Sequence, residues 1–291
     1  MIQQLDSLLV SSSLICMVLA GLVGLLVGSF LNVVIYRLPI MMQRNWRKEC
    51  LEYLELPAEP ELAPFNLVLP LSRCPACGTP IKPYQNVPVI SYLLLRGKCA
   101  ACRHPIALRY PLIEALTAVM SVVVAWHFGY GLQTLFALLL TWVLVALSFI
   151  DIDHHLLPDS ITLPVLWLGL SLSVFGIYTD SHASVMGAVF GYLSLWSVYH
   201  LFKLLTGKEG MGFGDFKLLA LLGAWLGWQM LPLIILLSSL VGTLISVVVI
   251  LLTQRDHRTP IPFGPYLAVA GWIALLWGPQ INGMYLAYIG L

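Results

Sequence analysis

The sequence contains few charged residues: they make up 10% of its 291 residues, and the formal net charge is only +1. Soluble domains carry about 25% charged residues, so this composition excludes an ordinary soluble protein. The small net charge gives no indication of a nucleic-acid partner, and we expect none. With 59% hydrophobic residues, the chain is typical of an all-α polytopic membrane protein surrounded by membrane lipid.

Several familiar catalytic motifs are also absent. The sequence has no serine nucleophile motif, no HExxH zinc motif and no GxGxxG in a strand–helix unit. These absences argue against serine and zinc peptidase mechanisms and against a classical methyl-donor fold. The N-terminus lacks the basic start of a cleavable signal, and its apolar run continues directly into SFLNVVIYRLP. We therefore interpret the first apolar run as a membrane segment.

Apolar runs long enough to cross about 30 Å of hydrocarbon occur eight times. They are the segments 9–36, 112–128, 132–150, 161–178, 184–204, 216–230, 232–253 and 265–289. Ten of the fifteen Lys and Arg residues lie between Arg37 and Arg109, and eight crossings place all fifteen on one side. The positive-inside rule then predicts a cytoplasmic loop here and both termini outside the cytoplasm.

The polar segment 38–111 contains two CxxC pairs separated by 21 residues. The four cysteines are Cys74, Cys77, Cys99 and Cys102. Two such pairs can supply four thiolates to a tetrahedral zinc ion, which would staple a domain with a thin core. A redox dithiol is the alternative, although a cytoplasmic location argues against stable disulfides. We predict structural Zn²⁺ in 38–111, between a first transmembrane segment (1–37) and a seven-helix membrane domain (112–291).

Two acidic segments lie at the ends of apolar runs. FIDIDHHLLPDS (149–160) contains Asp151, Asp153 and Asp159, and GFGDFK (212–217) contains Asp215. Helix capping explains Asp159 and is possible for Asp215, but it does not explain the glycines before Asp215. Glycines permit positive φ and a close approach of another backbone, as an extended peptide substrate would require. Two carboxylates that share a proton near a membrane would suit aspartic peptidase chemistry.

In these features the chain resembles the bacterial type IV prepilin peptidases, a family of membrane aspartic peptidases with a GxGD motif. The resemblance covers almost the whole chain. It rests on GSFLNVVIYRLP, both CxxC pairs, PYQNVPVISYLLLRGKC, ALRYPLIE, FIDIDHHLLPD and GMGFGDFKLLA. It implies that Asp151, seven residues before Pro158, and Asp215 are the catalytic aspartates, with Asp153 as the competitor for the first. It also implies that Gly212 and Gly214 give the substrate access.

The resemblance further implies two activities at the cytoplasmic face of the bacterial inner membrane. Prepilins and pilin-like secretion proteins would lose their leader at a Gly–Phe-type junction. S-adenosylmethionine would then methylate the new N-terminal amine. The segment 83–114 is the expected methyl-donor region, with Gly97 as the candidate residue.

Two other interpretations remain open. The first is a presenilin-type intramembrane peptidase, which shares GxGD but should lack the tetracysteine loop. The second is a zinc-regulated transporter whose aspartates carry protons or cations. A transporter should show internal repeats or broken helices, and the sequence shows no convincing repeat.

Overall fold

The structure, a computed structural model, describes residues 13–57, 64–253 and 262–289. The described residues form nine α-helices and two short 3-10 helices, and within them the only β pairing is two isolated bridges. The predicted all-α fold is confirmed. The chain divides into two compact units, Met1–Thr134 and Leu135–Leu291. The three-part division 1–37, 38–111 and 112–291 stays a prediction.

In the first unit, α2 (Ser13–Tyr53) packs against α4 (Arg109–Phe128) along a row of small residues. A Cβ atom added at Gly24 would lie 2.6 Å from the Ser121 Oγ, and one at Gly28 would lie 2.8 Å from the Glu114 Cα. Small residues three or four positions apart let two membrane helices approach closely. The glycines of the first apolar run therefore serve helix packing.

Helix α2 is longer than the apolar run from which it was predicted. It continues as one helix through Pro39 and the charged residues up to Tyr53. The stretch after Pro39 contains several Arg, Lys, Glu, Met and Gln residues, which favour a helix, whereas an internal proline removes only one backbone hydrogen bond. The helix thus carries its charged end well beyond the apolar run.

The charged end of α2 holds the irregular segment 65–70. Arg37 is buried and donates hydrogen bonds to the backbone carbonyls of Asn66 and Pro70. The guanidinium of Arg44 lies 4.4 Å from the centre of the Phe65 ring. Buried arginine is costly unless it is paired or hydrogen-bonded. These contacts therefore give Arg37 a structural role.

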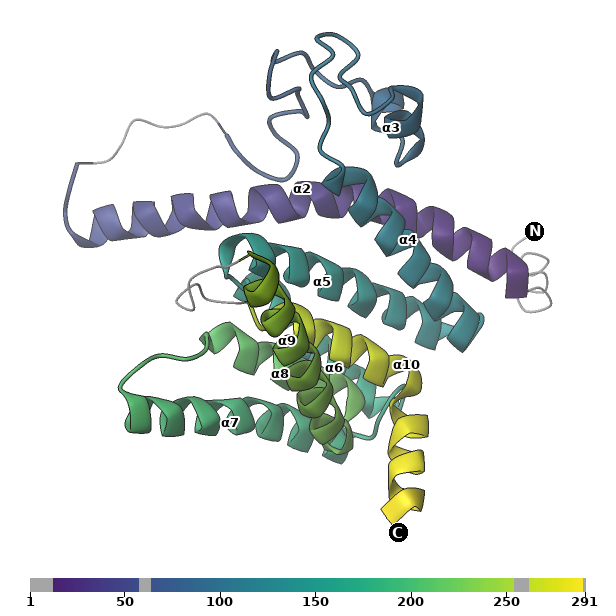
Figure 1. The fold of residues 1–291 in the computed structure, drawn as a ribbon, viewed down its shortest axis with the longest axis vertical. Coiled ribbons are helices and arrows are strands. Elements are labelled where there is room, and N and C mark those ends of the chain that lie inside the picture. The colour runs from purple at the N-terminus through teal and green to yellow at the C-terminus, as the bar shows by residue number, and fades with distance from the viewer. Residues whose placement is uncertain (1–12, 58–63, 254–261, 290–291) are drawn as a thin grey trace. The chain divides into compact units, whose positions relative to one another are not determined.

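The second unit contains six of the helices (Figure 1). They are α5 (Leu132–His154), α6 (Asp159–Val174), α7 (Ser181–Thr206), α8 (Phe213–Leu226), α9 (Leu231–Thr253) and α10 (Gly264–Ile289). Helix α8 contacts α6, α7 and α10, and ten of its 14 residues are buried. Because it is apolar on all sides, α8 forms the core of this unit.

Close contacts to α6 and α7 hold α8 in place. A Cβ atom at Gly187 of α7 would lie 2.2 Å from the Gly223 carbonyl oxygen of α8, so the two backbones touch. Trp225 of α8 lies over Gly169 of α6 and donates its Nε1–H to the Val165 carbonyl at 2.8 Å. Backbone contact of this kind leaves no room for sliding. The start of α8 is thereby fixed relative to its neighbours.

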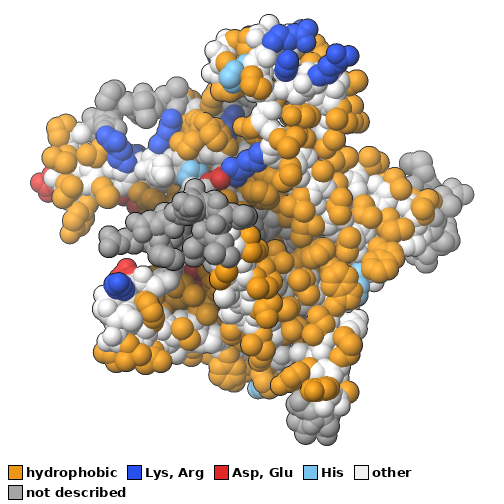
Figure 2. Space-filling model, in the orientation of Figure 1, with side chains coloured by type: hydrophobic (Ala, Val, Ile, Leu, Met, Phe, Trp, Pro, Cys, Tyr) orange, Lys and Arg blue, Asp and Glu red, His pale blue; other side chains and the backbone are white. Residues whose placement is uncertain are grey.

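The described helices have the length and surface of a multi-pass membrane protein. Five stretches are long and apolar enough to cross a membrane: α2, α4, α5, α7 and residues 228–245. Figure 2 shows hydrophobic side chains over much of the visible surface, and such large apolar surfaces need lipid around them. The eight described helices of 14 residues or more overlap the eight predicted apolar runs. That all eight cross the membrane stays a prediction.

Two of the eight helices are short. Helix α6 has 16 residues and α8 has 14, which correspond to about 24 Å and about 21 Å of helix. Both lengths are less than the ~30 Å of a hydrocarbon core. Both helices have an aspartate in their first turn, and the candidate site lies at these helix starts.

Candidate active site and metal centre

The last turn of α5 and the first turn of α8 bring Asp151 and Asp215 together. Their exposed fractions are 6% and 7%, and the two carboxyl groups interact electrostatically. Asp153 is exposed, because residues two apart lie on different faces of a helix. The structure therefore pairs Asp215 with Asp151, the aspartate that the resemblance favoured.

The two carboxyl groups have different hydrogen-bond partners. The Oδ2 atom of Asp151 accepts a buried hydrogen bond from the Gly264 N–H at 3.0 Å. The Oδ1 atom of Asp215 is buried, and it has no partner among the described residues. The backbone of Gly212 lies beside the Asp215 carboxyl. A buried carboxylate oxygen without a donor is costly, which favours a proton shared within the pair.

Asp215 is not the cap of α8. The N-cap residue is Gly212, and no side chain caps this helix start. Asp215 lies three residues further on, where a carboxylate still meets the positive end of the helix dipole. Its position is therefore that of a group held near a helix start, with the Oδ1 atom free of any partner among the described residues.

The two glycines predicted to give access differ from each other. A Cβ atom at Gly212 would meet only the Asp215 Oδ2, at 3.9 Å, so the space beside it is open. A Cβ atom at Gly214 would lie 2.8 Å from the Cβ of Leu157. Neither glycine has a positive φ; in this loop that conformation belongs to Gly207, with φ +68°. The space around these two positions, rather than their backbone conformation, thus explains why residues 212 and 214 are glycine.

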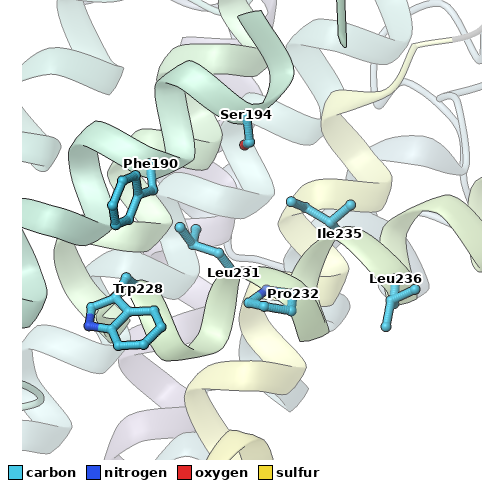
Figure 3. Close-up of a pocket in the computed structure, with 7 residues that line it drawn as sticks. All are labelled: Phe190, Ser194, Trp228, Leu231, Pro232, Ile235 and Leu236. Atoms are coloured by element: carbon cyan, nitrogen blue, oxygen red, sulfur yellow. The ribbon is translucent and has the colours of Figure 1, made fainter. Parts of the chain in front are cut away.

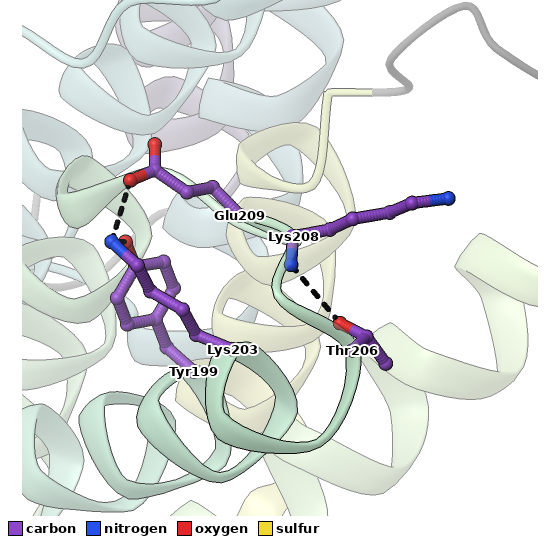
Figure 4. Close-up of polar contacts among 5 residues, drawn as sticks. All are labelled: Tyr199, Lys203, Thr206, Lys208 and Glu209. Carbon is purple, nitrogen blue, oxygen red and sulfur yellow. Dashed lines mark hydrogen bonds and ion pairs between the residues drawn. The ribbon is translucent and has the colours of Figure 1, made fainter.

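Polar contacts shape the loop that leads from α7 to the GxGD turn (Figure 4). Lys203 donates to Glu209 at 2.8 Å, and the Lys208 N–H donates to the Thr206 Oγ1 at 3.3 Å. The hydrogen bond from Lys203 lowers the pKa of Glu209. Because the ion pair is exposed, it orders the loop with little effect on stability.

Asp159 does not cap α6, contrary to the expectation from the sequence. The N-cap residue is Pro158, and Asp159 is the first residue of the helix. Its two carboxylate oxygens lie 2.8 Å and 2.6 Å from the Lys217 Nζ of α8. The sequence could not reveal this pair, because the partner comes from a distant helix. Asp159 therefore links the start of α6 to the start of α8.

An apolar pocket of about 530 Å³ lies elsewhere in the second unit. Figure 3 shows its lining, which comes from α7, the 3-10 helix Trp228–Met230 and α9. The lining residues are Phe190, Ser194, Trp228, Leu231, Pro232, Ile235 and Leu236. Neither aspartate lines it. A pocket with one hydroxyl and no ionisable group offers nothing for hydrolysis, so it is separate from the candidate active site.

In the first unit, the four predicted cysteines form one cluster. The four sulfur atoms all lie within 4.8 Å of one another; they belong to Cys74, Cys77, Cys99 and Cys102. The Sγ atoms of Cys74 and Cys102 are 3.7 Å apart. Four sulfurs at about 2.3 Å from a central zinc ion would be separated by ~3.8 Å. The cluster therefore fits a tetrahedral thiolate site, as the spacing predicted.

The two CxxC turns have the same local structure. In the first, the Cys74 N–H donates to the Thr79 carbonyl and the Gly78 N–H donates to the Cys74 carbonyl. In the second, the equivalent bonds join Cys99 to His104 and Arg103 to Cys99. Gly78 and Arg103 both have positive φ, at +70° and +61°. Such repeated turns point backbone amides at the sulfurs. Each turn presents its two sulfurs on the same side.

The acidity of the thiols bears on metal binding as well. Hydrogen bonds with Thr79 lower the pKa of Cys77, and the thiolate is the form that binds metal, whereas burial and the neighbouring thiols raise the pKa of Cys102. Cys16 is buried against α4 and Cys50 is exposed on α2; neither belongs to the cluster.

Gly97, the candidate methyl-donor residue, lies in a tight turn next to the second cysteine pair. Its φ is +66°, and a Cβ atom there would lie 2.8 Å from the Tyr92 Oη. Its N–H donates to the Tyr92 carbonyl, and its carbonyl accepts from the Ile106 N–H. Both the conformation and the space require glycine. The turn thus explains why position 97 is glycine.

Two residues near the candidate sites, Glu114 and Gly264, could not be predicted from the sequence. Glu114 is buried in α4 and accepts the Val89 N–H at 2.8 Å, which ties the segment after the first cysteine pair to α4. Gly264 reaches Asp151 from the start of α10. The available signals were an acidic residue in an apolar run and a glycine before proline at a helix start. Neither signal identifies a partner.

Comparison with known proteins gives two family matches, one in each unit. The model described as Bacterial Peptidase A24 N-terminal domain matches residues 22–128, and the model described as Type IV leader peptidase family matches residues 138–247. The first range contains the cysteine cluster and the second contains both aspartates. No solved structure matches the chain.

The chain is also similar to curated proteins over nearly its full length. A prepilin leader peptidase/N-methyltransferase of Stutzerimonas stutzeri is 59% identical over 97% of this chain and 98% of that protein. Proteins of the same name from Pseudomonas aeruginosa and Legionella pneumophila are 61% and 44% identical. They align over 92% and 98% of this chain and over 93% and 99% of their own lengths.

Proposed function

Because this chain belongs to the type IV leader peptidase family, we propose that it removes the leader from prepilins and pilin-like secretion proteins and then methylates the new N-terminal residue. The observation that carries the peptidase part is the buried pair Asp151–Asp215 beside the open position at Gly212. The relatives' shared name supports both activities. The family match over 138–247 leaves the transporter interpretation without support.

The aspartate pair would hydrolyse the peptide bond without a covalent intermediate. One carboxylate takes a proton from water while the water oxygen attacks the scissile carbonyl carbon, and the other carboxyl gives its proton to the carbonyl oxygen. The C–N bond then breaks as the amine nitrogen takes a proton from the first carboxyl and the hydroxyl proton returns to the second. The products are a leader with a new carboxylate and a pilin with a free amine.

We place the reaction at the cytoplasmic face of the bacterial inner membrane. The distribution of Lys and Arg supports this orientation, with both termini outside the cytoplasm. A basic prepilin leader would stay in the cytoplasm while its apolar helix lies in the bilayer. Reporter fusions at Leu56 and Lys208 should be cytoplasmic, and fusions at Tyr130 and Asp180 should be external. A cytoplasmic reporter at Tyr130 would contradict this topology.

The cysteine cluster would hold one structural Zn²⁺ ion within a cytoplasmic domain formed by residues 38–111. Its four sulfurs have the spacing of a tetrahedral thiolate site. Such an ion has no open coordination position, so its contribution is to folding. Between the end of α2 and the start of α4, the described part of this segment contains two short helices, η1 (Pro83–Asn86) and α3 (Ile90–Leu94), and is otherwise irregular. A metal staple would therefore set its fold.

Methyl transfer would take place near the segment 83–114, with S-adenosylmethionine supplying the methyl group to the new amine. Two contacts bring this segment to α2 and α4: the Asn32 side chain of α2 donates to the Tyr110 carbonyl, and the Val89 N–H donates to the Glu114 carboxylate of α4. Gly97 supports the segment through its left-handed turn. Gly97→Ala should therefore lower methylation of a pre-cleaved pilin more than it lowers leader cleavage.

One experiment tests both activities. Purified protein is incubated with a prepilin and isotopically labelled S-adenosylmethionine, and mass spectrometry then reads the loss of the leader and the mass of the new N-terminus. We expect a shortened product that carries one labelled methyl group. The matched control is the double variant Asp151→Asn/Asp215→Asn with a pre-cleaved pilin. It should still methylate, because amine methylation does not use the hydrolytic pair. Intact prepilin after incubation with the wild-type protein would overturn the proposal.

A further inference from the structure

The backbone N–H of Gly264, at the first residue of α10, is bonded to the Asp151 carboxyl inside the second unit. The N···Oδ2 distance is 3.0 Å, and the contact is buried. The first N–H groups of a helix have no partner within the helix, and the positive end of the helix dipole favours an anion. The next residue is Pro265, which has no N–H to offer. The bond from Gly264 thus favours the ionised form of Asp151.

The contact also requires glycine. A Cβ atom at position 264 would lie 2.7 Å from the Asp151 Oδ2 and 3.3 Å from the Leu157 Cδ1. Real Cβ atoms do not approach an oxygen so closely. The carboxylate would have to move away from the amide. Leu157 also fills the space beside Gly214 at the start of α8, so it offers little room for the displaced group.

Asp215 is in the opposite situation. Its Oδ1 is buried without a partner among the described residues, and it interacts with the charge of Asp151. A proton on Asp215 relieves both penalties, because a carboxylic acid can donate to the neighbouring carboxylate. Among the described residues, the hydrogen bond from the backbone of Gly212 favours the opposite state. In Asp151, by comparison, the Oδ2 accepts a hydrogen bond of good length from the Gly264 N–H.

Among the residues that the structure describes, other charged groups must be considered beside the pair. His155, exposed in the turn after α5, interacts electrostatically with Asp151. On the start of α6, Asp159 is neutralised by Lys217 of α8. From α10 the group that reaches Asp151 is the uncharged amide of Gly264. A pH experiment must therefore separate the pair from His155.

We propose, resting on the peptidase function above, that Gly264 is a positioning residue which holds Asp151 as the ionised water-activating base and leaves the shared proton on Asp215. The asymmetry comes from three helix ends: the C-terminus of α5, the start of α8 and the start of α10. Asp151 takes the proton from water, and Asp215 gives its proton to the carbonyl oxygen of the scissile bond. The amide of Gly264 keeps Asp151 ready for this step.

The test is the pH dependence of cleavage in Gly264→Ala. If the displaced carboxylate loses its amide donor, it takes up a proton more readily. The acidic limb of the pH–rate profile should then move to higher pH by about one pH unit, and the activity should recover as the pH is raised. The profile is recorded in a His155→Asn background, because Asn tolerates the positive φ at this position. A wild-type acidic limb in Gly264→Ala would overturn the proposal.

Two glycines of the same helix provide matched controls. A Cβ atom at Gly271 would lie 2.5 Å from a Leu222 side-chain carbon, away from the aspartates, whereas a Cβ atom at Gly283 would meet nothing within 4 Å. Gly271→Ala should lower the unfolding temperature without moving the acidic limb, and Gly283→Ala should leave both unchanged. An equal shift of the limb in Gly271→Ala and Gly264→Ala would show a packing effect and contradict the proposal.

A second measurement applies even if Gly264→Ala does not fold. Asn is neutral and has the shape of a protonated carboxyl, so Asp215→Asn imitates the proposed state and Asp151→Asn does not. At neutral pH the unfolding temperature of Asp215→Asn should equal or exceed that of the wild type, and that of Asp151→Asn should be lower. The reverse order would assign the proton to Asp151 and overturn the proposal.

These results are distinguishable from failure of the peptidase function itself. If the wild-type protein does not cleave a prepilin, or if both single Asp→Asn variants still cleave it, the proposed function fails. If the wild type cleaves and needs both aspartates but the order of unfolding temperatures is reversed, only the role of Gly264 fails.

Discussion

The cysteine cluster of the first unit is assembled from two short turns, whereas the aspartate pair of the second unit is assembled from helices that are distant in sequence. Backbone hydrogen bonds within each turn orient the cysteines, and three of the four side chains are at least partly exposed. Both aspartates are buried, and their positions depend on the packing of α8. The cysteine site would be completed by the metal ion that we propose it binds, whereas the aspartate site is held in place by its protein neighbours.

This difference predicts different sensitivities. A metal cluster on irregular chain takes its stability from the bound ion, so it is sensitive to loss of a ligand and tolerant of changes nearby. A buried carboxyl pair takes its geometry from packed backbones, so a single added methyl group can displace it. The same change in size should therefore have a larger effect around Asp215 than around the cysteines.

The largest expected effect is on cleavage by the aspartate variants. Asp151→Asn, Asp215→Asn and the double change should each lower cleavage by at least about 10⁴-fold, because members of one catalytic unit do not contribute additively. The control is Asp153→Asn, which lies two residues from Asp151 but is exposed, and which should retain substantial activity. Leader release is measured by mass spectrometry. An inactive Asp153→Asn with an active Asp151→Asn would contradict the assignment.

Loss of the metal should have the next largest effect, confined to the first unit. The wild-type protein should contain close to one zinc ion per chain, and Cys74→Ser/Cys77→Ser should lose it. Without the ion, the segment that contains both CxxC turns should become sensitive to protease, since apparent zinc binding energies in small domains are about 10–16 kcal/mol. Cys16→Ser/Cys50→Ser is the control and should keep the ion. A zinc-free wild type with a Cys74–Cys77 disulfide would favour the redox interpretation.

A smaller effect should separate the two glycines of the GxGD turn. Gly214→Ala places a methyl group 2.8 Å from Leu157 and should lower the stability by about 1–3 kcal/mol, with a loss of cleavage. Gly212→Ala enters open space and should unfold near the wild-type temperature, whatever its effect on substrate binding. The unfolding temperature in detergent is the measurement. Equal destabilisation by both variants would contradict the packing role of Gly214.

The smallest effect should come from the ion pair between α6 and α8. Asp159 and Lys217 have side-chain exposed fractions of 52% and 29%, so solvent screens the pair and its contribution should be about 0.2–1 kcal/mol. A double-mutant cycle with Asp159→Asn and Lys217→Met measures it through the free energy of unfolding. A coupling energy near zero at low salt would show that the pair does not stabilise the helix starts.

Much of this protein could be predicted from its sequence because the signals are local. The eight apolar runs correspond to eight helices, since long apolar segments in lipid must satisfy their backbone hydrogen bonds internally. The cysteine cluster followed from the CxxC spacing, because each pair and the turn behind it lie within a few residues. The GxGD glycines identified the start of α8, although for space rather than for positive φ.

Other features were decided only by the tertiary structure. Asp159 was expected to cap α6, but it pairs with Lys217, which packing brings to it from another helix. Sequence spacing alone left Asp153 as a competitor of Asp151; in the structure Asp151 is buried and Asp153 is exposed, and the assignment of Asp151 as the catalytic residue stays a prediction. The hydrogen bond from Gly264 to Asp151 joins residues that no local pattern relates. The sequence by itself determined which segments are helices and which cysteines gather, because those depend on near neighbours along the chain. Only the tertiary structure decided which carboxyl groups meet and which amide reaches them, because those depend on helices brought together by packing.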